Sequence, residues 1–313
     1  MPRGLWRIAL TWLGLGLTGL LITACDTLDS GAQKRAPLGP PHVPSAESQA
    51  LMSYYRKVEG NLANQGLLRT DGGGPDTPFN KRQLVQNFVQ IGVFNEFTLE
   101  NGRYTNRRSE GRVQRWIKPV NISMTFGGSV PQKMRDQDTR FVTNFAGRLA
   151  RVTGHRISMA KRRGNFHVAV LDTDEIKAFG PTLQKLIPGL EASVASQITS
   201  MSRPIYCAVY AFSNEDRPDI FHTAVAIVRA EHPDLLRQSC FHEEIAQGLG
   251  LSNDSPAARP SIFNDDDEFA LLTRHDELLL KMLYDPRLPL GGSPAEARPV
   301  IEVLAAELMN GES

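Results

Sequence analysis

The segment "CFHEEIAQGLGLSND", residues 240–254, limits the possible folds of this chain more than any other stretch. On the helix that it predicts, Phe241 and Ile245 share one face, while Leu236 and Cys240 lie on a second one. A helix that is apolar on two sides is largely buried, with other elements packed against both sides. We therefore expect the chain to build a layered domain around this helix.

Polar residues on the same helix raise the question of what they contact. The helix opens at Asp234 and closes at Gly248, and Glu243 and Gln247 point the same way because they lie one turn apart. They lie beside the second apolar face, where buried polar groups need partners. Three interpretations stay open: a hydrogen-bonded structural network, a cation or ligand site, and a solvated helix surface.

The remaining patterns predict an α+β domain, a mixed sheet with helices on one side. Alternation of apolar and polar residues marks the strands, and helical spacing with capping boxes marks the helices. In chain order we expect a strand at 120–126, a helix at 131–154, a hairpin at 155–172, two or three short helices at 173–201, an antiparallel hairpin at 203–231, the helix described above, and helices capped at Thr273 and Ser293.

Residues 46–111 form a small helical region in this prediction. Helical spacing of apolar residues marks 45–68 and 80–94, and a segment rich in glycine and proline separates them. We expect this region to pack on the main domain, residues 112–290, which residues 291–313 follow as a C-terminal helix.

The N-terminus has the pattern of a bacterial lipoprotein signal. Arg3 and Arg7 precede an apolar run too short to span a bilayer as a helix, and the small residues before Cys25 resemble a lipobox. We expect residues 1–24 to be removed, Cys25 to be lipidated, and residues 25–45 to act as a flexible tether. The pattern predicts a protein that is anchored in the cell envelope by its lipid and faces the periplasm. It does not determine which membrane leaflet holds the lipid. An ordinary secretory signal with a chance cysteine is the alternative.

The charge of the chain does not favour nucleic-acid binding. Its formal net charge is +1, and it contains no long run of charges of one sign.

The cysteines predict a disulfide. Besides Cys25, the chain contains Cys207 and Cys240. An even pair in an oxidising compartment favours a Cys207–Cys240 disulfide over two buried free thiols.

Read from Glu243 onward, "EEIAQGLGLSN" resembles the zinc-binding motif H-E-x-x-H-x-x-G-x-x-H of metzincin metallopeptidases. Glu243 and Gln247 then stand at the first two ligand positions, with Glu244 at the catalytic glutamate. Gly250 matches the glycine, and Asn253 matches the third ligand. The resemblance implies that Glu244 is the general base and that the fold is zincin-like, a mixed sheet with a long active-site helix.

Further motifs extend the resemblance over residues 112–290. "SIFND" resembles the Met-turn that lies beneath the zinc of metzincins, and the helix at 272–284 resembles their C-terminal helix. With E-E-x-x-Q, "LGLSND" and "LYDPRL", these motifs make the chain similar to a family of bacterial lipoproteins with a domain of unknown function, placed near the metzincin-like peptidases. The Met-turn-like residues are Ser261, Ile262, Phe263 and Asn264, with Phe263 in place of the methionine.

None of the three positions that match the zinc ligands of metzincins carries a histidine. Zinc is held mainly by Cys, His and carboxylate groups, so one carboxylate and two amides make a poor zinc site. Amide oxygens suit calcium or another hard divalent cation better. Asp254 would complete a two-carboxylate set with Glu243, whereas His242 is turned away from it and has no partner one turn later.

Three functions are compatible with this pattern. The preferred one is a pseudoprotease, in which the old cleft binds a peptide or an envelope partner without cutting it. The second is a divergent metallopeptidase that uses Glu244 as its base and an oxygen-rich ligand set. The third is a structural envelope lipoprotein whose cleft is simply packed. The loss of all three histidines on an otherwise intact scaffold favours the pseudoprotease.

Overall fold

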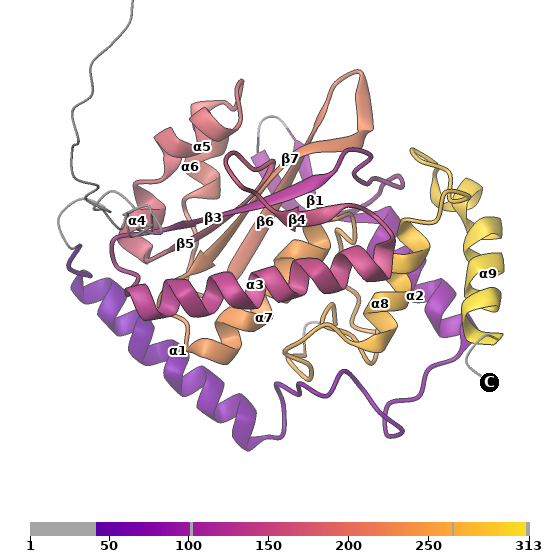
Figure 1. Cartoon of the computed structure of the whole chain (residues 1–313), viewed down its shortest axis with the longest axis horizontal. Coiled ribbons are helices and arrows are strands. Elements are labelled where there is room, and N and C mark those ends of the chain that lie inside the picture. Colours follow the sequence, from indigo (N-terminus) through magenta and orange to yellow (C-terminus); the bar gives the residue numbers. More distant parts are fainter. Residues whose placement is uncertain (1–41, 101–102, 265, 311–313) are drawn as a thin grey trace, which may run out of the picture. The chain divides into compact units, whose positions relative to one another are not determined.

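A mixed sheet of five strands, in the order β4-β3-β5-β7-β6, organises the fold (Figure 1). The structure is a computed structural model that describes residues 42–100, 103–264 and 266–310, so the predicted signal segment, Cys25 and most of the tether lie outside the described residues. Four strands run parallel and β6 is antiparallel to β7, as the predicted α+β fold with a mixed sheet requires. The strands are β3 (Val120–Phe126), β4 (Ile157–Met159), β5 (Phe166–Leu171), β6 (Cys207–Asn214) and β7 (Arg217–Arg229).

The hairpin predicted at 155–172 is wrong, because β4 and β5 do not pair with each other. Both strands pair in parallel with β3, on opposite sides of it. Strand β4 ends beside Ile122, and β5 begins beside the same residue, so the chain crosses β3 and continues in the same direction. Gly164 permits this crossing, since a Cβ atom there would lie 2.5 Å from the carbonyl oxygen of Asn121.

Helices cover both faces of the sheet, which corrects the expectation of helices on one side. Alternate residues of β5 divide between two cores, because Val168 and Val170 pack with α3 and α7 while Ala169 and Leu171 pack with α4, α5 and α6. A strand that is apolar on both faces needs cover on both. The helices are α3 (Gln132–Thr153), α4 (Thr173–Lys177), α5 (Gly180–Leu186), α6 (Ala192–Ile198) and α7 (Asp234–Gly248).

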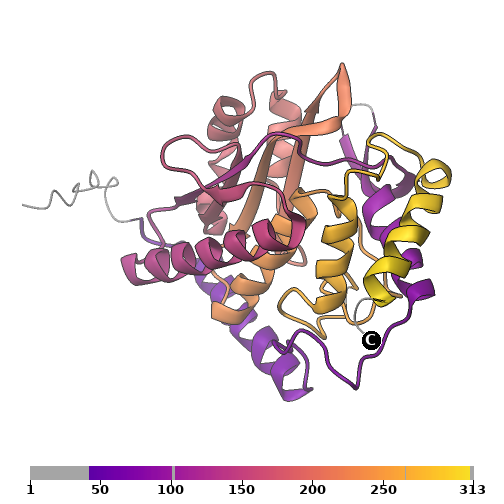
Figure 2. The same cartoon turned by 45° about the vertical axis from the view of Figure 1, so that its right-hand side comes forward.

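The N-terminal helical region contains the two predicted helices, and both have side-chain caps. Ser45 accepts a hydrogen bond from the amide of Ser48, and Asn80 forms a capping box with Gln83. The second helix packs against the C-terminal helix, and Figures 1 and 2 show the two side by side. The helices outside the sheet layers are α1 (Ala46–Asn64), α2 (Lys81–Val93), α8 (Arg274–Leu283) and α9 (Pro294–Asn310).

Region 46–111 also contains a β-hairpin that the helical prediction missed. Strands β1 (Phe94–Glu100) and β2 (Arg103–Glu110) pair antiparallel and form a second, two-stranded sheet. The sequence carries the signal for it, since the two residues between the strands are Asn101 and Gly102, the dipeptide most typical of two-residue hairpin loops. Among the described helices, none is both long enough and apolar enough to cross a membrane.

Candidate functional site

Helix α7 is held in place at its C-terminal end by side chains from distant segments. The indole Nε1 of Trp116 donates to the carbonyl of Gly248 at 2.8 Å, and the hydroxyl of Tyr284 donates to the carbonyl of Leu249 at 3.0 Å. The helix also lies close to the sheet, since a Cβ atom at Gly248 would come within 2.5 Å of the Phe166 ring. The helix and the candidate residues on it are therefore fixed relative to the strands.

The chain leaves α7 through the turn expected at Gly250. Its φ angle of 126° lies in the region that favours glycine, and a Cβ atom there would collide with the carbonyl oxygen of Gln114. The turn brings the following residues back toward the helix. The Nε2 atom of Gln247 donates a hydrogen bond to Oδ1 of Asp254 at 3.1 Å.

Asn253 has a different partner from Gln247. Its side-chain Nδ2 donates to the carbonyl of Gln90 at 2.8 Å, and its backbone amide donates to the carbonyl of Ile91 at 3.2 Å. Both acceptors belong to α2, and the Asn253 side chain is buried. The turn thus brings together Gln247 and Asp254, while the amide of Asn253 ties the loop to α2.

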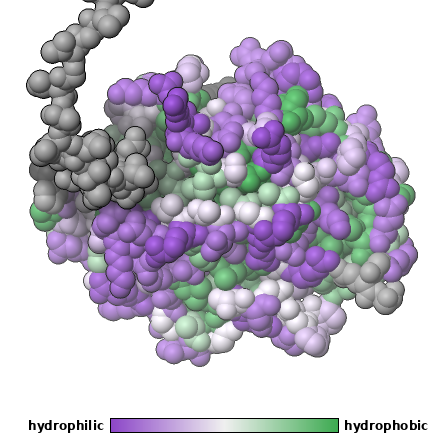
Figure 3. Space-filling view, viewed as in Figure 1, coloured by the Kyte–Doolittle hydropathy of each residue, from purple (hydrophilic) through white to green (hydrophobic). Residues whose placement is uncertain are grey.

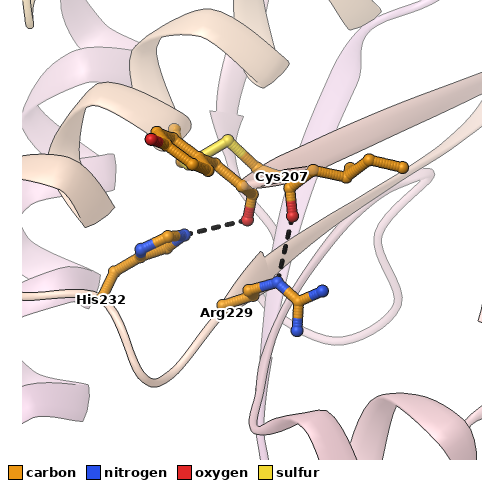
Figure 4. Close-up of a disulfide and its surroundings, with 6 residues drawn as sticks. Cys207, Arg229 and His232 are labelled. Atoms are coloured by element: carbon orange, nitrogen blue, oxygen red, sulfur yellow. Dashed lines mark hydrogen bonds between the residues drawn. A yellow bond between two sulfur atoms is a disulfide. The ribbon is translucent and has the colours of Figure 1, made fainter. Parts of the chain in front are cut away.

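The two glutamates of the motif lie next to the disulfide. Carboxylate oxygens of Glu243 and Glu244 and the sulfur of Cys207 all lie within 4.8 Å of one another. Glu244 is buried and Glu243 is half-buried. The predicted disulfide is present between Cys207 and Cys240, so the alternative of two free thiols is wrong (Figure 4).

These donors do not fit a zinc ion as a ligand set. A disulfide sulfur is not a thiolate, and zinc is bound by thiolates, imidazoles and carboxylates. Gln247 and Asn253 could offer only amide oxygens, which are not among the usual zinc ligands, and their amide nitrogens donate to Asp254 and to the Gln90 carbonyl. What the arrangement offers is a pair of neighbouring carboxylates, Glu243 and Glu244, which favours contact with a cationic group.

His242 packs within the core. Its ring stacks on Phe145 with centroids 3.7 Å apart, and its Nδ1 accepts a hydrogen bond from the amide of Leu272 at 2.9 Å. Burial lowers the pKa of His242 to about 3, so the ring is neutral at physiological pH. Its position explains why the histidine takes no part in the polar group around Gln247.

The Met-turn-like segment is a tight turn fixed by one carboxylate of α8. Asp276 Oδ1 accepts from the hydroxyl of Ser261 at 2.6 Å, and its Oδ2 accepts from the amide of Ile262 at 3.1 Å. Phe263 is fully buried in the same core as the apolar face of α7. Asn264 is buried and its Oδ1 accepts from the amide of Asp266, whereas Asp265 lies outside the described residues.

Sequence reasoning did not single out the residues that fix the other end of α7. Arg237 is 1% exposed, and its Nε lies 2.9 and 3.0 Å from the two carboxylate oxygens of Asp138 in α3. At the end of β7, His232 and Arg229 donate to the carbonyls of Tyr206 and Ile205, which lead into β6 (Figure 4). The sequence did contain a signal for the contact between Arg237 and Asp138, namely an arginine on a helix that is otherwise buried.

Comparison with known proteins gives one positive result. The family described as "Protein of unknown function (DUF2927)" matches residues 81–303, which is well over half of the chain. Neither the curated proteins nor the solved structures contain a significant match. The matched range includes the whole five-stranded sheet, α7 and the turn at residues 261–264, and on this basis the chain is a member of the DUF2927 family.

Proposed function

We propose that this protein is a lipid-anchored, periplasm-facing pseudoprotease that binds an extended peptide along β6 and does not cut it. The observation that carries the proposal is the position of β6. It is the last strand of its sheet, and no described strand pairs with its outer edge. An edge strand presents backbone N–H and C=O groups that an added strand can pair with.

The disulfide supports this use of β6. Cys207, the first residue of the strand, is bonded to Cys240 of α7, so the edge is fixed relative to the helix. The strand is half-buried over most of its length, and Ile205 just before it is 42% exposed. A rigid edge reduces the entropy that binding must overcome.

The acidic pair gives the bound peptide a preferred chemistry. Glu243 and Glu244 lie beside Cys207, at the start of the edge strand. Glu244 is buried and Glu243 is half-buried, so Glu243 is the carboxylate that a lysine or arginine side chain of the peptide can contact. A suitable peptide therefore pairs its backbone with β6 and carries a basic residue near the end that lies beside Cys207.

Few large apolar side chains are well exposed among the described residues. Hydrophilic residues cover most of the face in Figure 3, with apolar residues showing between them in small areas. Among the described residues, the large apolar side chains that are well exposed come from four separate segments: Val43, Ile117, Ile205 and Val303. Recognition through backbone pairing and charge suits such a surface better than docking on a broad apolar patch.

The ligand positions support binding over cleavage. In a metallopeptidase the groups at 243, 247 and 253 would converge on a metal, but here the amides of Gln247 and Asn253 serve as hydrogen-bond donors to the protein itself. The alternative, a divergent metallopeptidase with Glu244 as base, rests on the closeness of Glu244 to Glu243. The lipid anchor rests on the lipobox-like segment before Cys25.

Site-specific photo-crosslinking in cells tests the binding site. A photoreactive residue at Ala208 or Ala211 of β6 should crosslink a partner, and the same residue at Glu302, exposed on α9, should not. The double change Glu243→Gln and Glu244→Gln should weaken the β6 crosslink. Equal crosslinking at Glu302, or none at β6, would show that β6 is not the binding edge.

Two further measurements separate the alternatives. Cys25→Ser should release the protein from the membrane fraction, and retention of that variant would contradict the lipid anchor. Peptidase activity that Glu244→Gln abolishes, together with a stoichiometric metal that Glu243→Ala removes, would establish the metallopeptidase instead.

A further inference from the structure

The sheet has a second place where ligands commonly bind, far along the chain from the α7 motif. After β3 the chain enters α3 on one face of the sheet, and after β5 it enters α4 on the other, as Figure 1 shows. Where neighbouring parallel strands send their connections to opposite faces, a crevice opens beyond the carboxyl ends of the strands. Here the two ends are Gly127 after β3 and Asp172 after β5.

One histidine and two aspartates meet at this position. The Nε2 atom of His42 lies 2.9 Å from Oδ2 of Asp172 and 3.6 Å from Oδ2 of Asp174. One ligand atom from each of the three residues lies within 4.8 Å of the others. His42 precedes α1, so the group joins the start of the described chain to the end of β5.

The carboxylate of Asp172 has one oxygen in use and one that faces His42. Oδ1 accepts the amide of Glu175 and caps α4. Oδ2 is buried, on a side chain that is 3% exposed, and it makes no hydrogen bond within the described part of the chain. The Nε2 of His42 also makes none, although the two atoms are 2.9 Å apart. The two atoms are therefore close without forming a hydrogen bond with each other. Two atoms that bind the same metal ion lie close together in this way.

Neighbouring residues position all three ligands. Oδ2 of Asp174 accepts the amide of Ser45 at 2.9 Å, which places the segment that carries His42. Glu175 accepts the amides of Asp172 and Ser129, so it joins the loops that follow β5 and β3. Such supporting hydrogen bonds orient the ligands in metal sites.

Two glycines leave room for this arrangement. A Cβ atom at Gly127 would overlap the carboxylate of Glu175. A Cβ atom at Gly128 would lie 3.1 Å from the Cβ of His42, closer than most side-chain contacts. Glycine in both positions lets His42 and Glu175 approach the end of β3.

We propose that His42, Asp172 and Asp174 bind one divalent transition-metal ion, with Zn²⁺ as the best match. Imidazole nitrogen and carboxylate oxygen are both zinc ligands, and the two carboxylates balance the charge of the ion. Water completes the coordination, since His42 and Asp174 are partly exposed. The ion fastens the segment before α1 to the carboxyl edge of the sheet. This proposal is independent of peptide binding at β6.

Equilibrium dialysis of the full-length protein in detergent against Zn²⁺, followed by elemental analysis, tests the site. We expect one ion per chain and a loss of affinity of about tenfold or more for His42→Ala, Asp172→Asn and Asp174→Asn. Asp172→Asn is the most informative variant, because asparagine also caps helices and the fold should persist. His222→Ala, which removes an exposed histidine of β7, should bind Zn²⁺ as the unmodified protein does.

A stability measurement gives a second readout. Added Zn²⁺ should raise the midpoint of thermal unfolding of the unmodified protein and of His222→Ala, and should not raise that of Asp172→Asn. Absence of saturable Zn²⁺ binding would mean that His42 and Asp172 form only an ion pair, and would overturn the proposal. Stoichiometric binding that survives all three substitutions combined would overturn it as well.

Discussion

The side-chain amide of Gln247 donates a hydrogen bond to Asp254, seven residues further along the chain and beyond the turn at Gly250. This contact joins Gln247, at the second ligand position of the metzincin-like motif, to Asp254, the residue that follows the third ligand position. An amide that donates through Nε2 to a carboxylate gives a neutral–anionic pair that is stable without an ion. The charge at position 247 therefore decides whether the pair attracts or repels.

Gln247→Glu should convert this attraction into repulsion. Two carboxylates would then face each other in a largely buried site, and we expect the free energy of unfolding to fall by about 1–3 kcal/mol at neutral pH. The repulsion raises the pKa of the pair in the folded state, so the loss should shrink as the pH falls through that raised pKa. Urea unfolding at pH 7.5 and pH 5 measures this, with Gln247→Leu as the uncharged control. Rescue of Gln247→Glu by added Ca²⁺ or Zn²⁺ would instead indicate a metal site.

Asn253→Asp tests the second amide in the same way. The change removes the donor to the Gln90 carbonyl and sets a carboxylate against a carbonyl oxygen, so it should cost about 1–3 kcal/mol of stability. Thermal unfolding of this variant is compared with that of Asn61→Asp, which is exposed on α1 and should change stability little. Tighter binding of a divalent cation by Asn253→Asp, without loss of stability, would contradict the structural role.

Elements with local signals could be predicted from the sequence. The capping boxes at Thr273 and at Ser293, the helix that ends at Gly154 and the hairpin of β6 and β7 all depend on residues within a few positions of one another. Strands β4 and β5 could not be paired correctly in this way. Their partner is β3, more than thirty residues earlier than β4, and adjacency in the chain favours the hairpin instead.

The same limit applies to the candidate sites. Helical spacing places Glu243 and Gln247 on one side of α7, and the sequence suggested Asp254 only as a second carboxylate ligand beside Glu243. In the structure Asp254 instead accepts a hydrogen bond from Gln247. The bond from Asn253 to Gln90 spans 163 residues of sequence, and no local pattern indicates it. His42 and Asp172 are likewise far apart in the chain and meet only because β5 ends beside the segment before α1.

The Cys207–Cys240 disulfide should be required for full stability. It closes a loop with a sequence separation of 33, and its removal should cost about 2–4 kcal/mol. Urea unfolding of Cys207→Ala with Cys240→Ala measures the loss. Maleimide labelling of the exported protein should modify these cysteines only after reduction, and labelling without reductant would show that the bond does not form in the envelope.

The buried pair of Arg237 and Asp138 should be sensitive to loss of either partner. Asp138→Ala removes the carboxylate that pairs with the Arg237 guanidinium, whose side chain is only 1% exposed. We expect the free energy of unfolding to fall by about 3–5 kcal/mol. Replacing both residues, as Asp138→Leu with Arg237→Met, should recover much of that loss because no charge stays buried. Chemical denaturation of the single and double variants measures the difference. If the double variant is less stable than Asp138→Ala, the ion pair itself stabilises the fold, and the cost of one unpaired charge does not explain the loss.

Two buried histidines should make the fold sensitive to acid. Burial lowers the pKa of His232 and of His242 to about 3, well below the value of about 6.5 for an unfolded chain. As the pH falls below 6.5, the unfolded state therefore binds protons that the folded state does not, and each histidine lowers stability by up to about 1.4 kcal/mol per pH unit. The loss continues until the pH approaches the folded-state pKa. Free energies of unfolding in urea, measured between pH 7.5 and pH 4.5, give this slope.

Substitution of the two histidines isolates their share of that slope. His242→Gln keeps an acceptor for the Leu272 amide, and His232→Gln keeps a donor for the Tyr206 carbonyl, so the fold should persist at pH 7.5. The double variant should lose stability less steeply on acidification than the unmodified protein, because glutamine does not titrate. His222→Gln, at an exposed position in β7, should leave the slope unchanged. An equally steep slope in the double variant would assign the acid sensitivity to other groups.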